Sequence, residues 1–274
     1  MDLTLSICVI VKNEEKNIEG MIDNVKDFAD EIIIVDTGST DGAYEYIKNL
    51  SVNNEKIKLF LYTSRRGFHF GEARNFCISK ATKEYILMLD ADERLSARLR
   101  ENFHQFLREK NPKVISMLRQ DEFVRHLTEY HERAFERNNE ILYGVDEESR
   151  VHEQLVHSYK VEKYNDPILH CQRENHWLTR PQRIFFQLGL EINRTPKTKS
   201  FFGHLLKGVW YGQWKFRKVY FKQAVYKDGW LGFKYSLLRG LYAFLLQLFV
   251  GLKPKEGYKY WEDSKYKIGK INTT

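Results

Sequence analysis

The sequence predicts an α/β fold with a mostly parallel central sheet, followed by a helical C-terminal extension. Apolar, β-rich runs at 4–11, 31–36, 57–62 and 85–89 alternate with amphipathic segments, and short turns join them. Such alternation is typical of a parallel sheet that helices cover on both sides. The run at 31–36, EIIIVD, is apolar enough to be buried on both faces, as a central parallel strand requires.

The segments between these strands have apolar residues at helical spacing, as at 16–28 and 71–81. After Asp92 the alternation weakens, although Ser96 is a candidate N-cap for a following helix. Residues 172–252 are mostly helical in character. The further elements expected are a helix from about Asp41, a helix over 96–109, a strand over 114–118 and short mixed strands over 122–161.

The composition is that of a folded protein in a reducing compartment. Of the 274 residues, 42% are hydrophobic and 14% aromatic, with 5 Pro and 16 Gly, which argues against a disordered or low-complexity chain. Cys8, Cys77 and Cys171 are odd in number and lack metal-ligand spacing, so neither a disulfide framework nor a zinc site is indicated. The apolar stretch near the N-terminus is too short for a signal peptide and is expected to form the first strand.

The net charge of +7 is unevenly distributed. From Lys197 onward there are 16 Lys or Arg and 4 Asp or Glu, a net charge of +12, so residues 1–196 have 28 and 33 and a net charge of −5. The two parts therefore differ in electrostatic character. We expect an N-terminal domain over 1–170 and a basic, aromatic-rich helical region over 171–274, with a soft boundary between 170 and 196.

Two carboxylates one residue apart, Asp90 and Asp92, follow the apolar strand at 85–89. The carboxyl edge of a parallel sheet is where ligands bind in open α/β folds. In an extended chain, side chains two apart project to the same side, so these two can converge on one hard cation such as Mg²⁺ or Mn²⁺, which also takes phosphate oxygens. The alternative is a solvated acidic turn after a strand.

Two further residues suit a nucleotide ligand. Asp36 ends the run at 31–36, where an acidic residue can accept hydrogen bonds from a nucleobase or a ribose, although a plain turn with an N-cap accounts for the same residues. Arg74 lies at the start of the helix at 71–81 and could hold a pyrophosphate bidentately. An ordinary surface arginine is the alternative for Arg74.

Four segments stand in a characteristic order along the first hundred residues. They are KNEE at 12–15, ADEIIIVDTGSTDGA at 29–43, GEARNFCISKA at 71–81 and EYILMLDADERLS at 84–96. Together they resemble glycosyltransferase family 2, and the nearest likeness is to the bacterial branch that contains the lipopolysaccharide-core β-glucosyltransferases. The likeness is dense over 4–100 and continues more sparsely in RAFER at 133–137, RVHE at 150–153 and DGW at 228–230.

The resemblance implies a nucleotide-sugar-binding fold of the GT-A type, a divalent cation (Mg²⁺ or Mn²⁺), and sugar transfer with inversion at the anomeric carbon, with UDP as the favoured carrier. It implies that Asp36 contacts the base and that Asp90 and Asp92 serve the ribose, the diphosphate and the metal. Lys12 departs from the aromatic residue commoner at this position in the wider family. The implied donor-binding residues are Lys12, Asn13, Glu14, Asp36, Arg74, Asp90, Ala91 and Asp92, with Asp90 and Asp92 as metal ligands.

An inverting displacement needs one base within hydrogen-bond reach of the acceptor hydroxyl. The Val-His-Glu segment makes Glu153 the candidate catalytic base. Surface residues on a strand are the alternative interpretation. The competing bases are Asp146, Glu147 and Glu132.

Other polar residues of the same region have less specific expectations. Arg133, Arg137 and His152 are candidates for contacts with the acceptor or the diphosphate, and exposed surface positions are the alternative. The remaining histidines of this region have no metal-ligand spacing, and structural or surface roles are expected for them. These histidines are His126, His131, His157, His170 and His176.

The basic C-terminal region interleaves Lys and Arg with Phe, Tyr and Trp over 194–226. This composition suits a membrane interface with anionic lipid, and we expect residues 197–252 to place a cytoplasmic protein on the inner face of the cytoplasmic membrane. A helical subdomain with solvated lysines is the alternative, and no nucleic-acid partner is expected. The apolar run at 240–252 has 13 residues, too few to span a bilayer.

The sequence thus predicts a glycosyltransferase that uses a nucleotide-sugar donor and an acceptor that is a cell-envelope glycan or a lipid-linked glycan. A sugar nucleotidyltransferase is disfavoured, because the segment after the first strand, VKNE, has no glycine with which to grip a triphosphate. A non-catalytic membrane-binding or nucleic-acid-binding protein is disfavoured by the carboxylates at the strand ends, which repel one another without a cation.

Overall fold

The computed structural model describes residues 3–63, 69–122, 124–144, 154–171, 188–189, 191–192 and 195–253. The chain divides into two units, each of which is described by itself. The first unit comprises Met1–Glu122 and Thr128–Gln172, and the second comprises Phe123–Leu127 and Arg173–Thr274.

The first unit is built on one sheet whose described strands have the order β3-β2-β1-β4-β7-β6-β10-β5. Four of them, β1 (Leu5–Val11), β2 (Glu31–Asp36), β3 (Ile57–Leu61) and β4 (Tyr85–Asp90), are parallel neighbours. Every residue of β2 is buried, as its apolar composition predicted. Because these strands share one direction, their carboxyl ends lie at one edge of the sheet.

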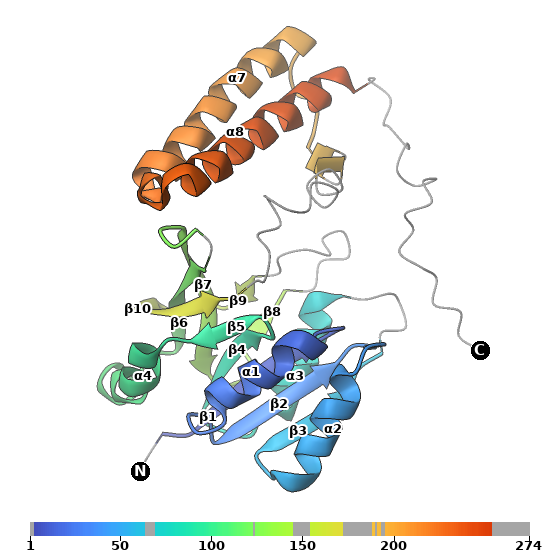
Figure 1. The fold of residues 1–274 in the computed structure, drawn as a ribbon, viewed down its shortest axis with the longest axis vertical. Helices are drawn as coiled ribbons and strands as arrows, with labels where there is room; N and C mark the ends of the chain where they lie inside the picture. The colour runs from blue at the N-terminus through green and yellow to red at the C-terminus, as the bar shows by residue number, and fades with distance from the viewer. Residues whose placement is uncertain are drawn as a thin grey trace, which may run out of the picture. The chain divides into compact units, whose positions relative to one another are not determined.

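Helices cover both faces of this sheet (Figure 1). Three helices, α1 (Glu15–Val25), α2 (Ala43–Asn53) and α4 (Ala97–Lys110), pack into one hydrophobic cluster. The helix α3 (Phe70–Lys80) packs into a second cluster. Ser96 caps α4 by accepting a hydrogen bond from the backbone N–H of Leu99, which confirms the N-cap expected from the sequence.

The rest of the sheet contains antiparallel pairs. It consists of β5 (Glu93–Leu95), β6 (Val114–Asp121), β7 (Thr128–Glu136) and β10 (Val161–His170), and a separate pair is formed by β8 (Leu142–Tyr143) and β9 (Leu155–Val156). β7 runs antiparallel to both β4 and β6. β6 and β10 are parallel to each other, so their carboxyl ends also point to one edge.

The second unit contains two long helices that pack side by side (Figure 1). They are α7 (Phe201–Arg217) and α8 (Gly229–Leu252), joined through a π-helical turn η1 (Lys218–Lys222) and a short 3-10 helix η2 (Val225–Asp228). The predicted fold class, α/β with a mostly parallel sheet and a helical extension, is confirmed.

The apolar C-terminal helix is longer than the sequence suggested. We expected an apolar element over 240–252, too short to span a bilayer, whereas α8 has 24 residues. The expectation was wrong because Lys234 and Arg239 interrupt the apolar run without interrupting the helix. Among the described residues, Val225–Leu252 is one stretch whose length and composition would allow a membrane crossing, with a mean hydropathy of 1.4 in its most apolar window.

Candidate functional site

Asp36 lies at the carboxyl end of β2 with an unusual hydrogen-bonding pattern. Its side chain is almost fully buried. One carboxylate oxygen, Oδ1, accepts hydrogen bonds from the backbone N–H groups of Gly38 at 2.8 Å and Ser39 at 2.9 Å. The other oxygen, Oδ2, is buried without a hydrogen-bond partner. Since a buried carboxylate oxygen normally has a partner, this oxygen is a candidate acceptor for a ligand N–H or O–H.

The loop after β1 is tied to the loop after β2. Asn13 has a positive φ of 58°, and its Oδ1 accepts a hydrogen bond from the backbone N–H of Thr40 at 2.7 Å. Its own backbone N–H donates to the hydroxyl of Ser39 at 3.0 Å. Asn13 and its neighbour Lys12 are exposed. Asn13 therefore joins the loop after β1 to the loop after β2, and it remains exposed at the carboxyl edge of the sheet.

Glu14 lies near the acidic residues that follow β4. Burial raises the pKa of Glu14, a hydrogen bond from Asn17 opposes that rise, and the negative charges of Asp92, Asp41 and Asp90 raise the pKa further. Four carboxylates, from the carboxyl end of β4 and the segments that follow β1, β2 and β4, therefore share one region of negative potential. Such a region favours cations.

Asp90 ends β4 and lies between two arginines. Its Oδ2 accepts a hydrogen bond from an Nη of Arg133 at 3.0 Å, and its Oδ1 is 3.7 Å from an Nη of Arg74. Burial alone would raise the pKa of Asp90, but the two guanidinium groups outweigh burial and hold the pKa well below its usual range. Asp90 is therefore ionised at neutral pH.

Arg133 reaches Asp90 because of an irregularity in β7. Ile115 pairs with Ala134, whereas the next residue, Ser116, pairs with Glu132, so Arg133 is an extra residue without a partner on β6. A β-bulge of this kind re-aims a side chain. Burial lowers the pKa of Arg133, but the charges of Asp90 and Glu93 raise it above the usual range.

Glu93 supports the turn that carries Asp90 and Asp92. It is fully buried, and its Oε2 accepts a hydrogen bond from the backbone N–H of Asp90 at 3.0 Å. Its Oε1 accepts from the Nε of Arg119 at 2.8 Å and from Arg133 at 3.4 Å. Glu93 therefore positions the backbone of the acidic turn and orients two guanidinium groups.

Ala91 contributes to this turn through its backbone. The side chain of Ala91 is buried, and its carbonyl accepts a hydrogen bond from an Nη of Arg94 at 2.9 Å. Arg94 also donates to the carbonyls of Glu93 at 2.7 Å and Asn17 at 2.8 Å. The turn is thus held on one side by Glu93 and on the other by Arg94.

His170 connects Asp92 to β6. Its Nε2 is 3.2 Å from Oδ2 of Asp92, and its Nδ1 is 3.4 Å from Oδ2 of Asp121. Burial lowers the pKa of His170, but the hydrogen bonds to both carboxylates outweigh burial and raise its pKa to about 9. For Asp92, burial alone would raise the pKa, but the hydrogen bond with His170 helps to lower the pKa below its usual range. The pair is therefore ionic at neutral pH.

Arg74 is held by aromatic rings as well as by Asp90. Its guanidinium lies 5.0 Å from the ring centroid of Tyr143 and 5.8 Å from that of Phe70. Asn75 fixes the strand β8, since its side chain donates to the carbonyl of Tyr143 and accepts from the N–H of Tyr143, both at 2.8 Å. The Nε of Arg74 is buried without a hydrogen-bond partner, so this arginine retains a donor for an anionic ligand.

Several residues selected from the sequence do not join this cluster. Arg137 donates through Nε to the carbonyl of Lys83, just before the amino end of β4. That end of the strand, Tyr85, lies about 16 Å along β4 from Asp90. Glu132 on β7 lies 3.2 Å from Nε2 of His157. The remaining candidates, Glu153, His152, Asp146 and Glu147, lie outside the described residues.

Four residues of the site were not expected from the sequence: Glu93, Arg119, Asp121 and His170. His170 was expected to have a structural or surface role, whereas it contacts a predicted metal ligand. Glu93 could have been suspected because it directly follows the acidic pair. The other three become neighbours through the pairing of β6 with β10, which no local pattern indicates.

A metal would need further ligands beyond the two aspartates. Among the residues that the structure describes, no group of three or more His, Cys, Asp or Glu side chains could hold a metal ion by itself. The oxygen donors Asp90 and Asp92 nonetheless fit a hard cation such as Mg²⁺, which is usually held by one or two carboxylates together with substrate phosphates.

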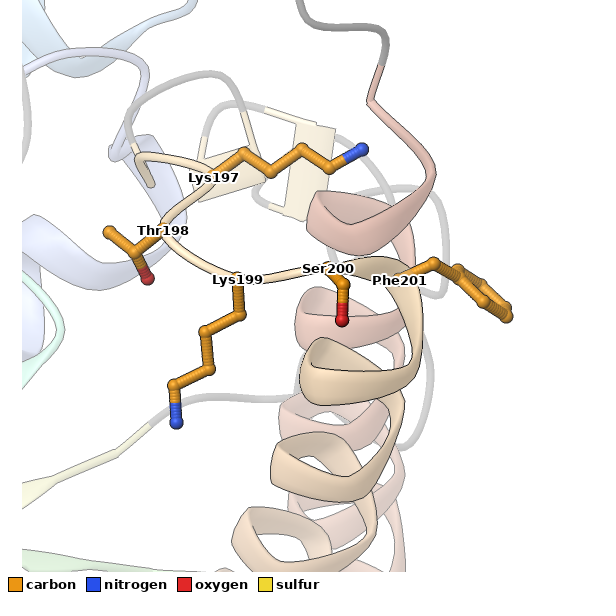
Figure 2. Close-up of a pocket in the computed structure, with 5 residues that line it drawn as sticks. All are labelled: Lys197, Thr198, Lys199, Ser200 and Phe201. Atoms are coloured by element: carbon orange, nitrogen blue, oxygen red, sulfur yellow. The ribbon is translucent and has the colours of Figure 1, made fainter.

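The second unit has a pocket of its own. Figure 2 shows that five consecutive residues line it and that the side chains of Lys197 and Lys199 point in different directions. Because the described lining residues all come from one short stretch of the chain, we assign no ligand to it. Its lining residues are Lys197, Thr198, Lys199, Ser200 and Phe201.

The fold places ionised carboxylates and guanidinium groups at the carboxyl ends of parallel strands, which is where ligands bind in open α/β enzymes. The family model for glycosyl transferase family 2 matches residues 6–185. The chain belongs to this family, which confirms the resemblance found in its sequence.

Curated relatives agree with this assignment. The lipopolysaccharide core biosynthesis glycosyltransferase LpsC of Rhizobium meliloti is 33% identical over 105 residues, which cover 38% of this chain and 37% of LpsC. An uncharacterized glycosyltransferase of Rickettsia typhi is 28% identical over 147 residues, which cover 54% of this chain and 42% of the relative. The chain thus spans less than half of the length of these relatives.

Two solved structures show similarity to this chain. A mannosyltransferase from Pyrobaculum calidifontis in complex with GDP-Man and Mn²⁺ is 16% identical, with a TM-score of 0.49, and the match covers 70% of this chain and 64% of that one. TarS of S. aureus in complex with UDP-GlcNAc is 14% identical, with a TM-score of 0.47 and coverage of 69% and 66%.

Proposed function

We propose that this chain is an inverting, metal-dependent glycosyltransferase. It moves a sugar from a nucleotide-diphosphate donor, with UDP as the favoured carrier, to a hydroxyl of a cell-envelope glycan or a lipid-linked acceptor. The observation that carries this proposal is the gathering of Asp36, Asp90 and Asp92 at the carboxyl ends of parallel strands, with two guanidinium groups on Asp90. That edge offers hydrogen-bond acceptors to a nucleoside and positive charge to a diphosphate.

Each part of the donor has a matching group in this chain. The partnerless Oδ2 of Asp36 accepts a hydrogen bond from the base, in agreement with the role implied by the family. Arg74 has an Nε donor without a partner, and a guanidinium matches the geometry of phosphate oxygens. A divalent cation held by Asp90 and Asp92 would neutralise charge on the departing diphosphate.

The acceptor hydroxyl must lose its proton as it attacks the anomeric carbon. We propose Glu153 as the base that takes this proton, on the resemblance of the Val-His-Glu segment to the family. Glu132 is the competing base among the described residues, and its hydrogen bond to His157 would keep its carboxylate oriented. Inversion then follows from attack on the face opposite the leaving group.

The proposed acceptor class has two supports. LpsC, a relative over 105 residues of this chain, is named for lipopolysaccharide core biosynthesis. The second unit has a basic and aromatic composition that suits a membrane surface, where envelope glycans on lipid carriers are found. We therefore also propose a peripheral location on the inner face of the cytoplasmic membrane.

Donor binding is the direct test. We expect UDP-sugars with Mn²⁺ to raise the unfolding temperature of the protein, since a ligand that binds the folded state stabilises it by mass action. Arg133→Ala should abolish most of this shift. Arg137→Ala is the matched control, because Arg137 lies at the opposite end of β4. Equal losses in the two variants, or no shift with UDP-, GDP- or other nucleotide sugars, would contradict the proposed site.

The proposed base is tested separately. Glu153→Gln should eliminate transfer to the acceptor and leave the donor-induced thermal shift unchanged, because the base does not contact the nucleotide. Glu132→Gln is the comparison variant. Unchanged turnover in Glu153→Gln together with lost turnover in Glu132→Gln would assign the role to Glu132.

A further inference from the structure

The helices α7 and α8 pack through small residues. A Cβ added to Gly240 would lie 2.8 Å from the carbonyl oxygen of Gly212, and one added to Gly251 would lie 2.8 Å from the Cβ of His204. His204 is fully buried and hydrogen-bonds through Nδ1 to Oε1 of Gln247 at 3.1 Å. Close approach at glycines together with polar bonds between helices is the packing used inside membranes.

The large apolar side chains of this hairpin point outward. On α7, Phe202 and Leu206 are 71% and 72% exposed, and Trp210 is 60% exposed. These residues are four apart, so they form one stripe along the helix. On α8, Leu241 and Leu252 are exposed and eleven residues apart, which again places them on one face. An exposed apolar surface of this kind marks an interaction site.

The charges around this surface favour an anionic membrane over a protein partner. Between Lys197 and Lys253 there are eleven Lys or Arg and one acidic residue, Asp228. The acid is already engaged, because it accepts hydrogen bonds from the backbone N–H and Nδ1 of His126. Lysines beside exposed tryptophans are typical of the headgroup region of a bilayer.

One contact decides how the hairpin can meet a bilayer. The turn between α7 and α8 packs around Val124, which forms a buried cluster with Val219, Val225 and Tyr235. Val124 belongs to the connection between β6 and β7, which comprises residues 122–127. The turn therefore packs on the segment that joins β6 to β7 in the sequence. If the hairpin spanned a bilayer, this turn would lie on one side of the bilayer and both ends of the hairpin would lie on the other side.

We propose that the α7–α8 hairpin lies in the plane of an anionic membrane surface, with the stripe at Phe202, Leu206 and Trp210 inserted among the headgroups. This inference rests on the membrane location proposed above and deepens it, since the length of α8 alone would equally allow a crossing. The hairpin binds by apolar burial and by attraction of its lysines to anionic lipid.

Vesicle binding tests the surface. The purified chain should co-float with vesicles of 70% phosphatidylcholine and 30% phosphatidylglycerol, and bind pure phosphatidylcholine at least about tenfold more weakly. The triple variant Phe202→Ser, Leu206→Ser, Trp210→Ser should lose binding to the anionic vesicles. The matched control replaces Val52 and Leu61, two exposed apolar residues of the first unit, by serine. Absence of binding by the unmodified protein, or equal binding by both variants, overturns the proposal.

A depth measurement tests the orientation and uses intact helices. Spin labels at Leu241→Cys and Leu252→Cys, in a Cys171→Ser background, should lie at the same bilayer depth. A spanning helix would separate them by about 16 Å along the membrane normal, because an α-helix rises 1.5 Å per residue. A separation of that size overturns the in-plane orientation. Labels shielded in a lipid-free dimer would instead assign the surface to a second copy.

Donor binding on the same samples separates this proposal from the proposed enzyme function. The triple serine variant should keep its full thermal shift with UDP-sugar and Mn²⁺. Membrane binding without any donor binding would leave the hairpin proposal standing and contradict the transferase proposal. Donor binding without membrane binding would contradict the hairpin proposal and leave the transferase proposal standing.

Discussion

The two units of this protein distribute polar and apolar residues in opposite ways. In the first unit, apolar residues such as Ile33 and Leu87 are fully buried, and the charged groups gather at one edge of the sheet. In the second unit, glycine, His204 and Gln247 lie inside, while Leu206 and Trp210 are exposed. The two units are therefore packed differently: the first buries apolar side chains between its sheet and its helices, whereas the second brings its two long helices together at glycines and at a polar pair.

The largest effect is expected when the charge of Asp90, in the charged edge of the first unit, is removed. Asp90→Ala should reduce transfer activity by about 100- to 1,000-fold, because the proposed function places the donor diphosphate and its cation at this carboxylate. Asp90→Asn, which keeps the shape, should lose a similar factor. The measurement is the rate of sugar transfer, with exposed Glu45→Ala as the control. A loss of less than tenfold would place the chemistry elsewhere.

A buried charge in the first unit should matter more for stability than an exposed one. Glu93→Ala should lower the free energy of unfolding by about 3–5 kcal/mol, because Arg119 and Arg133 would lose their common buried counter-ion. Denaturant unfolding measures this. Glu45→Ala, which breaks an exposed pair with Lys48, should leave the midpoint unchanged. Similar midpoints for the two variants would show that Glu93 does not hold the turn.

Substitution of a glycine should destabilise each of the two units for a different physical reason. Gly240→Ala should cost about 1–3 kcal/mol, since its Cβ would collide with the backbone of α7. Gly38→Ala should cost about 1–2 kcal/mol, because Gly38 has a φ of +98° with open space around it. Asparagine discriminates them, since it tolerates a positive φ but is larger than alanine. Unfolding curves should show partial recovery for Gly38→Asn and none for Gly240→Asn.

The smallest effect is a pH dependence of the first unit without bound metal. The pKa of His170 is raised to about 9 in the folded protein, above about 6.5 when unfolded. Its ion pairs therefore stabilise the fold fully below pH ~6.5 and lose this contribution as the pH rises through 9. The unfolding temperature should fall between pH 6.5 and 9.5 by more in the unmodified protein than in His170→Asn. Parallel profiles would contradict the ionic pair.

The paired carboxylate makes the opposite contribution. The pKa of Asp92 is lowered by its bond with His170, so its stabilisation is present above pH ~4 and is lost as the pH falls. Both contributions therefore coincide between about pH 4 and 6.5. Unfolding temperatures measured from pH 3 to 7 should rise less steeply in Asp92→Asn than in the unmodified protein.

Much of the first unit was predictable because its signals are local. The strand at 31–36 is apolar throughout its centre, and the cap at Ser96 is set by the residues beside it. The edge at which Asp36, Asp90 and Asp92 stand also followed from the sequence, because parallel strands that alternate with helices end at the same edge. The roles of these side chains in donor binding stay predictions.

The partners of those side chains were not predictable in the same way. Arg133 reaches Asp90 through a bulge, and His170 reaches Asp92 after an irregularity in the pairing of β10 with β6. Both depend on strand register, which a single sequence specifies weakly where the strands are polar. The length of α8 was missed because Lys234 and Arg239 ended the apolar run but not the helix.

The sequence by itself determined the family, the α/β alternation, the acidic strand ends and the separation of a mildly acidic part from a basic, aromatic one. Each of these depends on residues that are neighbours in the chain or on composition. Only the tertiary structure decided that Glu93, Arg119 and His170 complete the charged edge, and that the turn of the helical hairpin packs around Val124. The physical reason is that these contacts join segments far apart in the chain, where pairing register and helix packing choose the neighbours.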